Sequence, residues 1–203
     1  MNHLRLSLLA MALTGFAATT EAQQGPGRLT AGVFGGITLP SGDFGDEVGN
    51  GWHAGALAKM RLYGVLDLRA DGTFNKLGKK DIIGTIATVT TDAQLIHGNL
   101  DLLINLGPDS AAYPGDNSVS PYIMAGAGSY NLDYKADCTG TGCSDFDDPG
   151  SRNHFGVNIG GGATFPLGPL RTFVEGRYHR ISRSFSEGSS RSMILISAGV
   201  KFR

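Results

Sequence analysis

The sequence predicts an all-β fold, an eight-stranded antiparallel up-and-down β-barrel whose strands cross a membrane. Two observations predict it. Apolar residues recur at every second position in eight segments, which is the period of a strand and not of a helix. The opposite faces of these segments hold charged residues and many glycines, and 31 of the 203 residues are glycine, about twice the usual share. The net charge is −1, so the basic surface expected of a nucleic-acid partner is missing.

The first residues have the features of a secretory signal peptide. Residues 1–5 form a short basic segment, and residues 6–18 form an apolar run. Thr20-Glu21-Ala22 then offers small residues at the two positions that define a cleavage site. The apolar run is shorter than the roughly 20 residues that a spanning helix needs. We expect residues 1–22 to be a signal peptide and residues 23–203 to form an exported barrel domain.

The predicted strands follow the chain in order. They cover residues 28–39, 51–62, 65–74, a long segment that ends near Leu106, 121–132, 155–165, 172–179 and 194–202. Polar segments 40–50, 77–84, 133–151 and 184–190 are predicted to be external loops, whereas Tyr63-Gly64 and residues 166–169 are tight turns. Long loops at one end and short turns at the other are typical of membrane barrels. Segment 107–120 is a longer connection at the short-turn end.

Charged residues share the face that we expect to point into the barrel. An eight-stranded interior has room for side chains only, and the charges on this face are nearly balanced in sign, so they can pair with one another. The predicted interior ion-pair network consists of Lys59, Arg61, Asp67, Arg69, Asp71, Asp101, Glu175, Arg177, His179 and Lys201. His97 also lies on this face. Periodicity alone also fits a soluble periplasmic barrel that binds an apolar ligand, and this alternative stays open.

Aromatic residues near the strand ends predict two membrane girdles. Phe155 and Phe165 lie on one face of one strand, and their spacing corresponds to about 25 Å along the membrane normal, the height of the apolar band. In the fifth strand we favour Tyr122, Met124 and Tyr130 outward. The predicted girdle residues are Trp52, Tyr63, Tyr122, Phe155, Phe165, Tyr178 and Phe202.

Three motifs carry a family resemblance. Pro121-Tyr122 followed by Gly126 and Gly128 is similar to the "PY-x-x-x-G-x-G" strand of the outer-membrane β-barrel domain family, the OmpA/OmpX-type small barrels. Residues 156–162 and 173–178 look like that family's "G-x-N-x-G-x-G … F-x-E-x-R-Y" hairpin, and the last strand, ending at Phe202, resembles its sorting signal. The resemblance implies an eight-stranded barrel in the bacterial outer membrane.

The same resemblance implies the location and the partners. We expect a monomer in the cell outer membrane, surrounded by outer-membrane lipid, inserted by the barrel-assembly machinery and free to meet an external ligand or a host surface. Members of the family include structural proteins, adhesins and immune-evasion proteins. We therefore expect a structural or surface-interaction role through the external loops around Asp43, Lys79 and Cys138–Cys143.

The loop after the fifth strand holds both cysteines. Cys138 and Cys143 lie close together in an exported chain, so we expect a local disulfide. Metal binding or redox chemistry is the alternative. The segment from Asp133 to Asp148 is acidic and could hold Ca²⁺, but it lacks EF-hand spacing, and a solvated acidic loop is the favoured interpretation.

No pattern indicates an enzyme or a cofactor. Lipid A deacylase barrels use His and Ser on one outer face, but His179 and Ser182 are three residues apart and point to opposite sides of a strand. A nucleophile elbow, a phosphate-binding loop and zinc spacing are absent from the sequence. A narrow solute or ion pore and, less favoured, a lipid-modifying barrel enzyme remain the alternatives to the structural or surface-interaction role.

Overall fold

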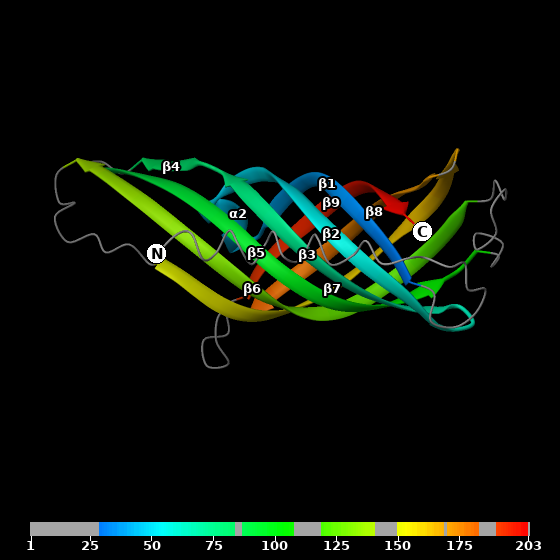
Figure 1. Ribbon diagram of the computed structural model, residues 1–203. Helices are drawn as coiled ribbons and strands as arrows, with labels where there is room; N and C mark the ends of the chain where they lie inside the picture. The colour runs from blue at the N-terminus through cyan, green and yellow to red at the C-terminus, as the bar shows by residue number, and fades with distance from the viewer. Residues whose placement is uncertain are drawn as a thin grey trace, which may run out of the picture.

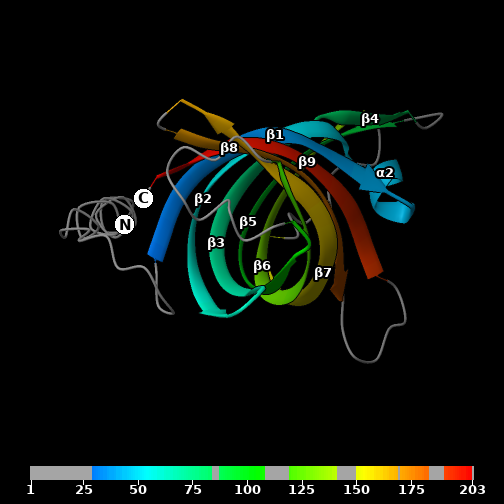
Figure 2. The same ribbon diagram turned by 90° about the vertical axis from the view of Figure 1, so that its right-hand side faces the viewer.

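The computed structural model describes residues 29–83, 87–107, 119–140, 150–168, 170–182 and 190–202. These segments form one sheet that is wound into a tilted barrel (Figures 1 and 2). The predicted signal peptide, residues 1–22, lies outside the described residues. Within the described ranges, no helix is long and apolar enough to span a membrane.

The barrel wall is antiparallel throughout and closes on itself. Its strands are β1 (Leu29–Ser41), β2 (Gly49–Tyr63), β3 (Leu66–Gly78), β4 (Lys80–Ile83), β5 (Ala87–Asn105), β6 (Ser120–Gly140), β7 (Gly150–Leu167), β8 (Leu170–Ser182) and β9 (Ser190–Phe202). Pairing of β1 with β9 and of β3 with β5 completes the ring. β4 continues the line of β3 along β5, so these two segments form one wall strand. The predicted eight-stranded up-and-down barrel is therefore confirmed.

The two faces of the wall are those of a membrane barrel. In β8 the exposed and buried positions alternate almost without a break, with Glu175 and Arg177 buried and Val174 and Tyr178 exposed. The same alternation in β3 buries Asp67, Arg69 and Asp71. Large apolar side chains lie on the outside of the wall; Ile159, for example, is 62% exposed. An apolar exterior around a charged interior is the inverse of a soluble barrel, and it suits a lipid environment.

The two ends of the barrel differ. At one end, here called the short-turn end, β2 joins β3 and β7 joins β8 through turns in which Gly64 and Gly168 have positive φ values of 53° and 58°. Glycine adopts this conformation without the steric cost that other residues meet. At the opposite end, here called the long-loop end, β1 joins β2 through α2 (Asp43–Glu47), and β4, β5 and β6 extend beyond the rest of the wall (Figure 1).

Three predicted loops contain regular structure. Segment 40–50 holds α2, segment 77–84 holds the end of β3 and all of β4, and β6 runs through much of segment 133–151 to Gly140. Strands can continue here because the backbone pairs through its own N–H and C=O groups and does not need apolar side chains. Composition therefore indicated loops where the backbone forms a polar extension of the sheet.

Glycines on the inner face make room for the larger polar side chains, and this predicts a matched pair of variants. A Cβ at Gly126 would overlap the Asp101 carboxylate and the Leu100 carbonyl, whereas one at Gly176, on the outer face, would meet nothing within 4 Å. We expect Gly126→Ala to destabilise the refolded barrel by about 1–3 kcal/mol through overpacking and Gly176→Ala to be near neutral. Denaturant unfolding in detergent, with the heat-dependent gel shift as a second readout, checks this. Equal effects of the two variants would contradict the proposed crowding of the interior.

Candidate functional site

A carboxylate placed between two arginines forms the centre of the interior. Glu175 of β8 accepts two hydrogen bonds from the guanidinium of Arg69, at 2.7 and 3.1 Å, and one from Nε of Arg177 at 3.0 Å. Tyr122 also donates to Glu175, at 2.8 Å. Two-pronged arginine–carboxylate pairs are among the stronger charge-assisted hydrogen bonds, so this contact joins β3, β6 and β8 across the barrel.

Two further carboxylates surround Arg177. Its guanidinium donates to Asp71 of β3 at 2.5 Å and to Asp101 of β5 at 3.2 Å. Nε of Arg69 lies 3.1 Å from Asp71. The remaining carboxylate oxygens accept from amides, since Asn158 donates to Asp101 at 2.8 Å and Asn99 donates to Asp71 at 3.2 Å. The arginines and carboxylates of this central cluster are buried and joined to one another.

A second charged group lies nearer the short-turn end. Asp67 forms ion pairs with Lys59 and with Arg61, and it accepts a hydrogen bond from Asn105 at 2.9 Å. Lys201 is buried close by, where its ammonium donates to Thr164 at 3.0 Å. The Lys201 ammonium also lies 5.1 and 4.6 Å from the ring centroids of Tyr122 and Phe173, a geometry that suits cation–π attraction.

A layer of three histidines lies between the central cluster and the long-loop end. His53 is held by Thr38 at 3.1 Å and by Ser197 at 2.8 Å. Its two neighbours in the layer, His97 and His179, lie with ring centroids 5.2 Å apart. Within the described residues, the side-chain partners that hydrogen-bond these three rings are hydroxyl and amide groups and not carboxylates.

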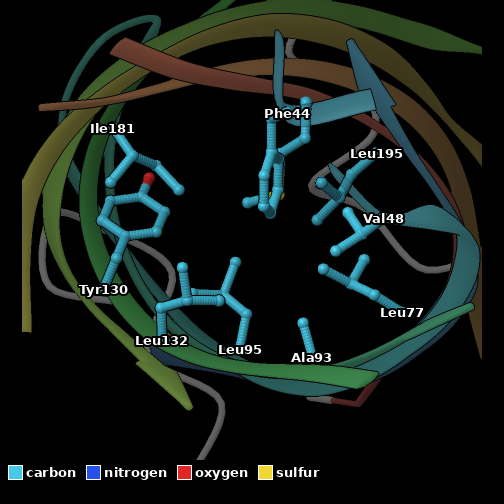
Figure 3. Packing of buried hydrophobic residues seen from close by; sticks show 10 residues of the cluster. Phe44, Val48, Leu77, Ala93, Leu95, Tyr130, Leu132, Ile181 and Leu195 are labelled. Atoms are coloured by element: carbon cyan, nitrogen blue, oxygen red, sulfur yellow. The ribbon is translucent and has the colours of Figure 1, made fainter. Parts of the chain in front are cut away.

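A cluster of buried apolar side chains lies at the long-loop end of the interior, and we call it the cap. It includes Phe44 of α2 and Val48, each 1% exposed. Their side chains point inward toward others that come from the surrounding wall (Figure 3). The remaining members are Leu77, Ala93, Leu95, Tyr130, Leu132, Ile181, Met193 and Leu195. The interior is therefore layered along its axis, with charges at the centre and apolar side chains beneath α2.

The ten residues predicted for the network all lie on the inner face, but they do not form one network. Eight of them take part in the ion pairs described above. His179 instead contacts the Tyr130 hydroxyl, and Lys201 contacts a hydroxyl and two rings. Among the described residues, neither of these two forms an ion pair. Arg171, which the sequence analysis left out, also lies on the inner face and is 9% exposed.

The predicted girdle is wrong at Tyr122. Its side chain is 3% exposed and reaches Glu175 inside the barrel, and Met124 and Tyr130, also predicted outward, are buried too. Tyr122 fits inside because Gly162 of the neighbouring strand has no side chain. A Cβ at Gly162 would lie 2.8 Å from the Tyr122 hydroxyl. Both faces of β6 carry small residues, so alternation could not decide its facing. The glycines opposite β6 in β7 were the signal that could have decided it.

The other predicted girdle residues lie on the outer face. Trp52, Phe155 and Tyr178 are exposed near the long-loop end, while Tyr63 and Phe202 are exposed at the short-turn end. Phe165, also near the short-turn end, is half-buried. Trp52 lies against Phe74, with ring centroids 5.7 Å apart. This arrangement is compatible with two girdles, whose contact with lipid headgroups stays a prediction.

The cysteine and calcium predictions fall largely outside the described residues. The backbone of Cys138 lies in β6, opposite Val89, whereas Cys143 is outside the described ranges, so the disulfide stays a prediction. Asp145, Asp147 and Asp148 are also outside them. Within the described part of the chain, no three His, Cys, Asp or Glu side chains gather as metal ligands would.

These features define an outer-membrane β-barrel protein, and the sequence comparison agrees. The model of the family described as "Outer membrane protein beta-barrel domain" matches residues 8–202, so the chain belongs to this family and lies in the cell outer membrane. The resemblance stated from the motifs is thereby confirmed. No curated protein matches the sequence.

Solved structures with the same fold include Neisserial surface protein A. It is 18% identical, with a TM-score of 0.61 over 88% of this chain and 98% of that one. The N-terminal barrel of OprF from Pseudomonas aeruginosa is 14% identical, with a TM-score of 0.47 over 87% and 99%. The outer membrane enzyme PagL is 15% identical, with a TM-score of 0.44 over 86% and 99%. At these identities the likeness concerns the fold alone, and we base nothing on the two lower scores.

The fold does not decide whether the chain is an enzyme. Small outer-membrane barrels are mostly non-enzymatic, and membership of the family does not by itself assign an activity. In this chain His179 is buried inside the barrel and Ser182 is exposed outside, so the two lie on opposite sides of the wall, as their spacing predicts. They cannot act together on a lipid.

The central cluster predicts a large difference between two variants. Glu175→Gln removes the charge that faces both Arg69 and Arg177, and breaking a buried ion pair in this way costs about 3–5 kcal/mol. Tyr122→Phe removes one hydrogen bond to the same carboxylate, and we expect a loss of about 1–3 kcal/mol. Unfolding of the refolded variants by denaturant in the same detergent measures both. A Glu175→Gln barrel as stable as wild type would show that the central cluster does not hold the strands together.

Proposed function

We propose that this protein is a non-conducting, non-enzymatic outer-membrane barrel that presents a rigid, strand-built interaction surface on the cell exterior. The observation that carries the proposal is the extension of β4, β5 and β6 beyond the rest of the wall (Figure 1). The protein would act as a monomer surrounded by outer-membrane lipid. A soluble periplasmic barrel no longer fits, because the large apolar side chains lie outside and the charges inside.

The outer face of the wall changes from apolar to polar where the extension begins. Phe155 is exposed there, and one step further Asn131 donates to Asn153 at 2.8 Å on the outer face, while Ser151 donates to Asn131 at 3.0 Å. β6 continues from Asn131 to Gly140. At about 3.3 Å per residue and a tilt of about 40°, this length carries the sheet roughly 20 Å beyond the apolar band.

Within the described residues, the strands of the extension include edges that pair on one side only. Among the described residues, β4 pairs with β5 only, and residues 135–140 of β6 pair with β5 only. An unpaired edge offers backbone donors and acceptors to an extended peptide, which can add as a further strand. The partner class that fits is therefore a protein that contributes an extended segment. The predicted Cys138–Cys143 disulfide would close a short loop at the tip of β6.

Closure of the interior is supported by two successive layers. Paired charges of the central cluster lie in the middle of the barrel, and the apolar side chains of the cap lie at the long-loop end. α2 is tied to the wall by an Arg191–Glu47 ion pair at 3.0 Å, by Arg191 over the Phe44 ring at 5.5 Å, and by Thr91, which donates to the Glu47 carbonyl at 2.7 Å. These contacts argue against the pore.

The first prediction from this proposal concerns conductance. Wild-type protein refolded into a planar bilayer should show no channel steps, because the central cluster obstructs the axis. Phe44→Ala should also remain silent, since it opens the cap and leaves the deeper charges paired. Steps in the wild type would replace the proposed role with a pore. Steps in the variant alone would contradict closure by the central cluster.

The second prediction concerns the open edge of β4. Asp81→Pro combined with Ile82→Pro removes N–H groups on both sides of the strand, because successive N–H groups point to opposite sides. Asp81→Ala with Ile82→Ala changes the same side chains and keeps the N–H groups. On plates coated with serum proteins, cells displaying the wild-type and alanine forms should be retained above vector controls, and cells displaying the proline form should not.

Equal surface display is the control for that comparison. An epitope inserted after Gly140 should bind antibody on intact cells, and one inserted after Gly168 should bind only after the outer membrane is permeabilised. Retention of the proline form at the wild-type level would exclude strand addition at β4. Retention of no form above vector would overturn the interaction role with this partner class.

A further inference from the structure

Two buried imidazoles in the histidine layer each have one nitrogen without a partner. His97 is 2% exposed and His179 is 0% exposed. Nδ1 of each ring is hydrogen-bonded, whereas Nε2 of each ring has no hydrogen-bond partner among the described residues. Buried polar atoms are nearly always satisfied, because leaving one unpaired costs about 1–3 kcal/mol. Two such atoms on neighbouring rings point to one bound group that satisfies both of them.

The orientation of Asn99 determines the tautomer of His97. Asn99 contacts the Asp71 carboxylate at 3.2 Å, and a carboxylate paired with arginine only accepts, so the amide nitrogen of Asn99 faces Asp71. The same nitrogen lies 2.9 Å from Nδ1 of His97. Nδ1 of His97 is then the acceptor, and the ring proton is on Nε2. The unmatched atom of His97 is a donor.

Tyr130 determines the tautomer of His179 in the same way. With its nitrogen facing Asp71, Asn99 presents its oxygen to the Tyr130 hydroxyl, which donates its single proton to it at 2.9 Å. The hydroxyl oxygen can then only accept from Nδ1 of His179, 2.8 Å away. The proton of His179 is on Nδ1. A second proton would make a buried cation with no carboxylate bonded to it, so Nε2 is an unmatched acceptor.

We propose that one buried water molecule bridges His97 and His179, accepting from Nε2–H of His97 and donating to Nε2 of His179. The two unmatched atoms have opposite hydrogen-bonding character, as a bridging water needs, and two partners are within the range that buried waters use. The ring centroids lie 5.2 Å apart, which is close enough for one molecule to reach both rings, and Nε2 of neither ring is hydrogen-bonded to the other ring. A water between them completes a layer that the cap covers on one side and the central cluster on the other.

The same tautomers disfavour a metal ion in this place. A metal ligand nitrogen must be free of its proton, and Nε2 of His97 carries one because Nδ1 is occupied by the Asn99 amide. Coordination would require His97 to lose its only ring proton or Asn99 to turn its oxygen toward Asp71. The chemistry of the surrounding residues therefore selects a neutral molecule that both donates and accepts.

Nuclear magnetic resonance on the refolded, ¹⁵N-histidine-labelled chain in detergent micelles tests the proposal. Two-bond proton–nitrogen correlations should show His97 protonated on Nε2 and His179 on Nδ1. The Hε2 proton of His97 should exchange slowly and give a cross-peak to water. Addition of equimolar Zn²⁺ should leave the ring nitrogen chemical shifts of His97 and His179 unchanged. A proton on Nδ1 of His97, no water cross-peak, or a Zn²⁺-dependent shift would each overturn it.

A pair of variants separates the bridge from general packing. His179→Phe keeps a ring and removes the acceptor, so the water cross-peak at His97 should disappear and exchange of Hε2 should accelerate. Ser197→Ala removes one hydroxyl from the same layer next to His53, and it should leave both signals at His97 unchanged. If both variants changed the His97 signals equally, the bridge would be excluded. The wild-type spectra decide the question even where His179→Phe fails to refold.

Discussion

The pairing of Arg69 and Arg177 with three buried carboxylates is the interaction on which the interior depends. The outer face of the wall is apolar, so a charged side chain of the narrow interior cannot reach water through the wall. It is tolerable only when opposite charges and hydrogen bonds surround it. Asp71, Asp101 and Glu175 come from three different strands, and the two arginines connect them. A one-residue slip of β3 against β5 would turn its charges toward lipid, so the same contacts enforce the register.

The layers of the interior follow from this centre. Neutral donors and acceptors, the histidines with their asparagine, threonine and tyrosine partners, lie between the charges and the cap. Polarity thus falls from Glu175 toward Phe44, and this one apolar side chain of α2 packs with apolar side chains from several strands. α2 has no side-chain hydrogen bond at its N-cap Gly42. A helix of one turn is marginal by itself, so the cap side chains that it buries hold it in place.

Much of this architecture could be predicted from the sequence, because residues on the inner and outer faces of a barrel strand alternate along the chain. Asp67, Arg69 and Asp71 alternate with Leu66, Leu68 and Ala70, and their inward facing needed no structure. Alternation could not predict the facing of β6, because both of its faces carry small residues, and Tyr122 was wrongly predicted to point outward. The sequence pattern also failed where the role of a residue depends on contacts with residues that are distant in the sequence. Phe44 lies in a glycine- and aspartate-rich segment whose composition predicts a loop, and only the fold brings it together with apolar side chains of the wall in the cap.

The extension at the long-loop end depends on the same wall. β5 and β6 are continuous from the short-turn end to their tips, with the register unbroken from Asn105 opposite Tyr122 to Ala87 opposite Gly140. Asp101 of β5 and Tyr122 of β6 take part in the central cluster and fix these strands toward the short-turn end. The parts of β5 and β6 at the long-loop end continue from there in one uninterrupted hydrogen-bonded ladder, without a flexible hinge. Under the proposed role, a partner that adds a strand at the rim would meet an edge whose direction is already set. Such an edge loses less conformational entropy on binding than a loop would, and this makes a strand-built rim better suited to recognition than its polar, loop-like composition indicates.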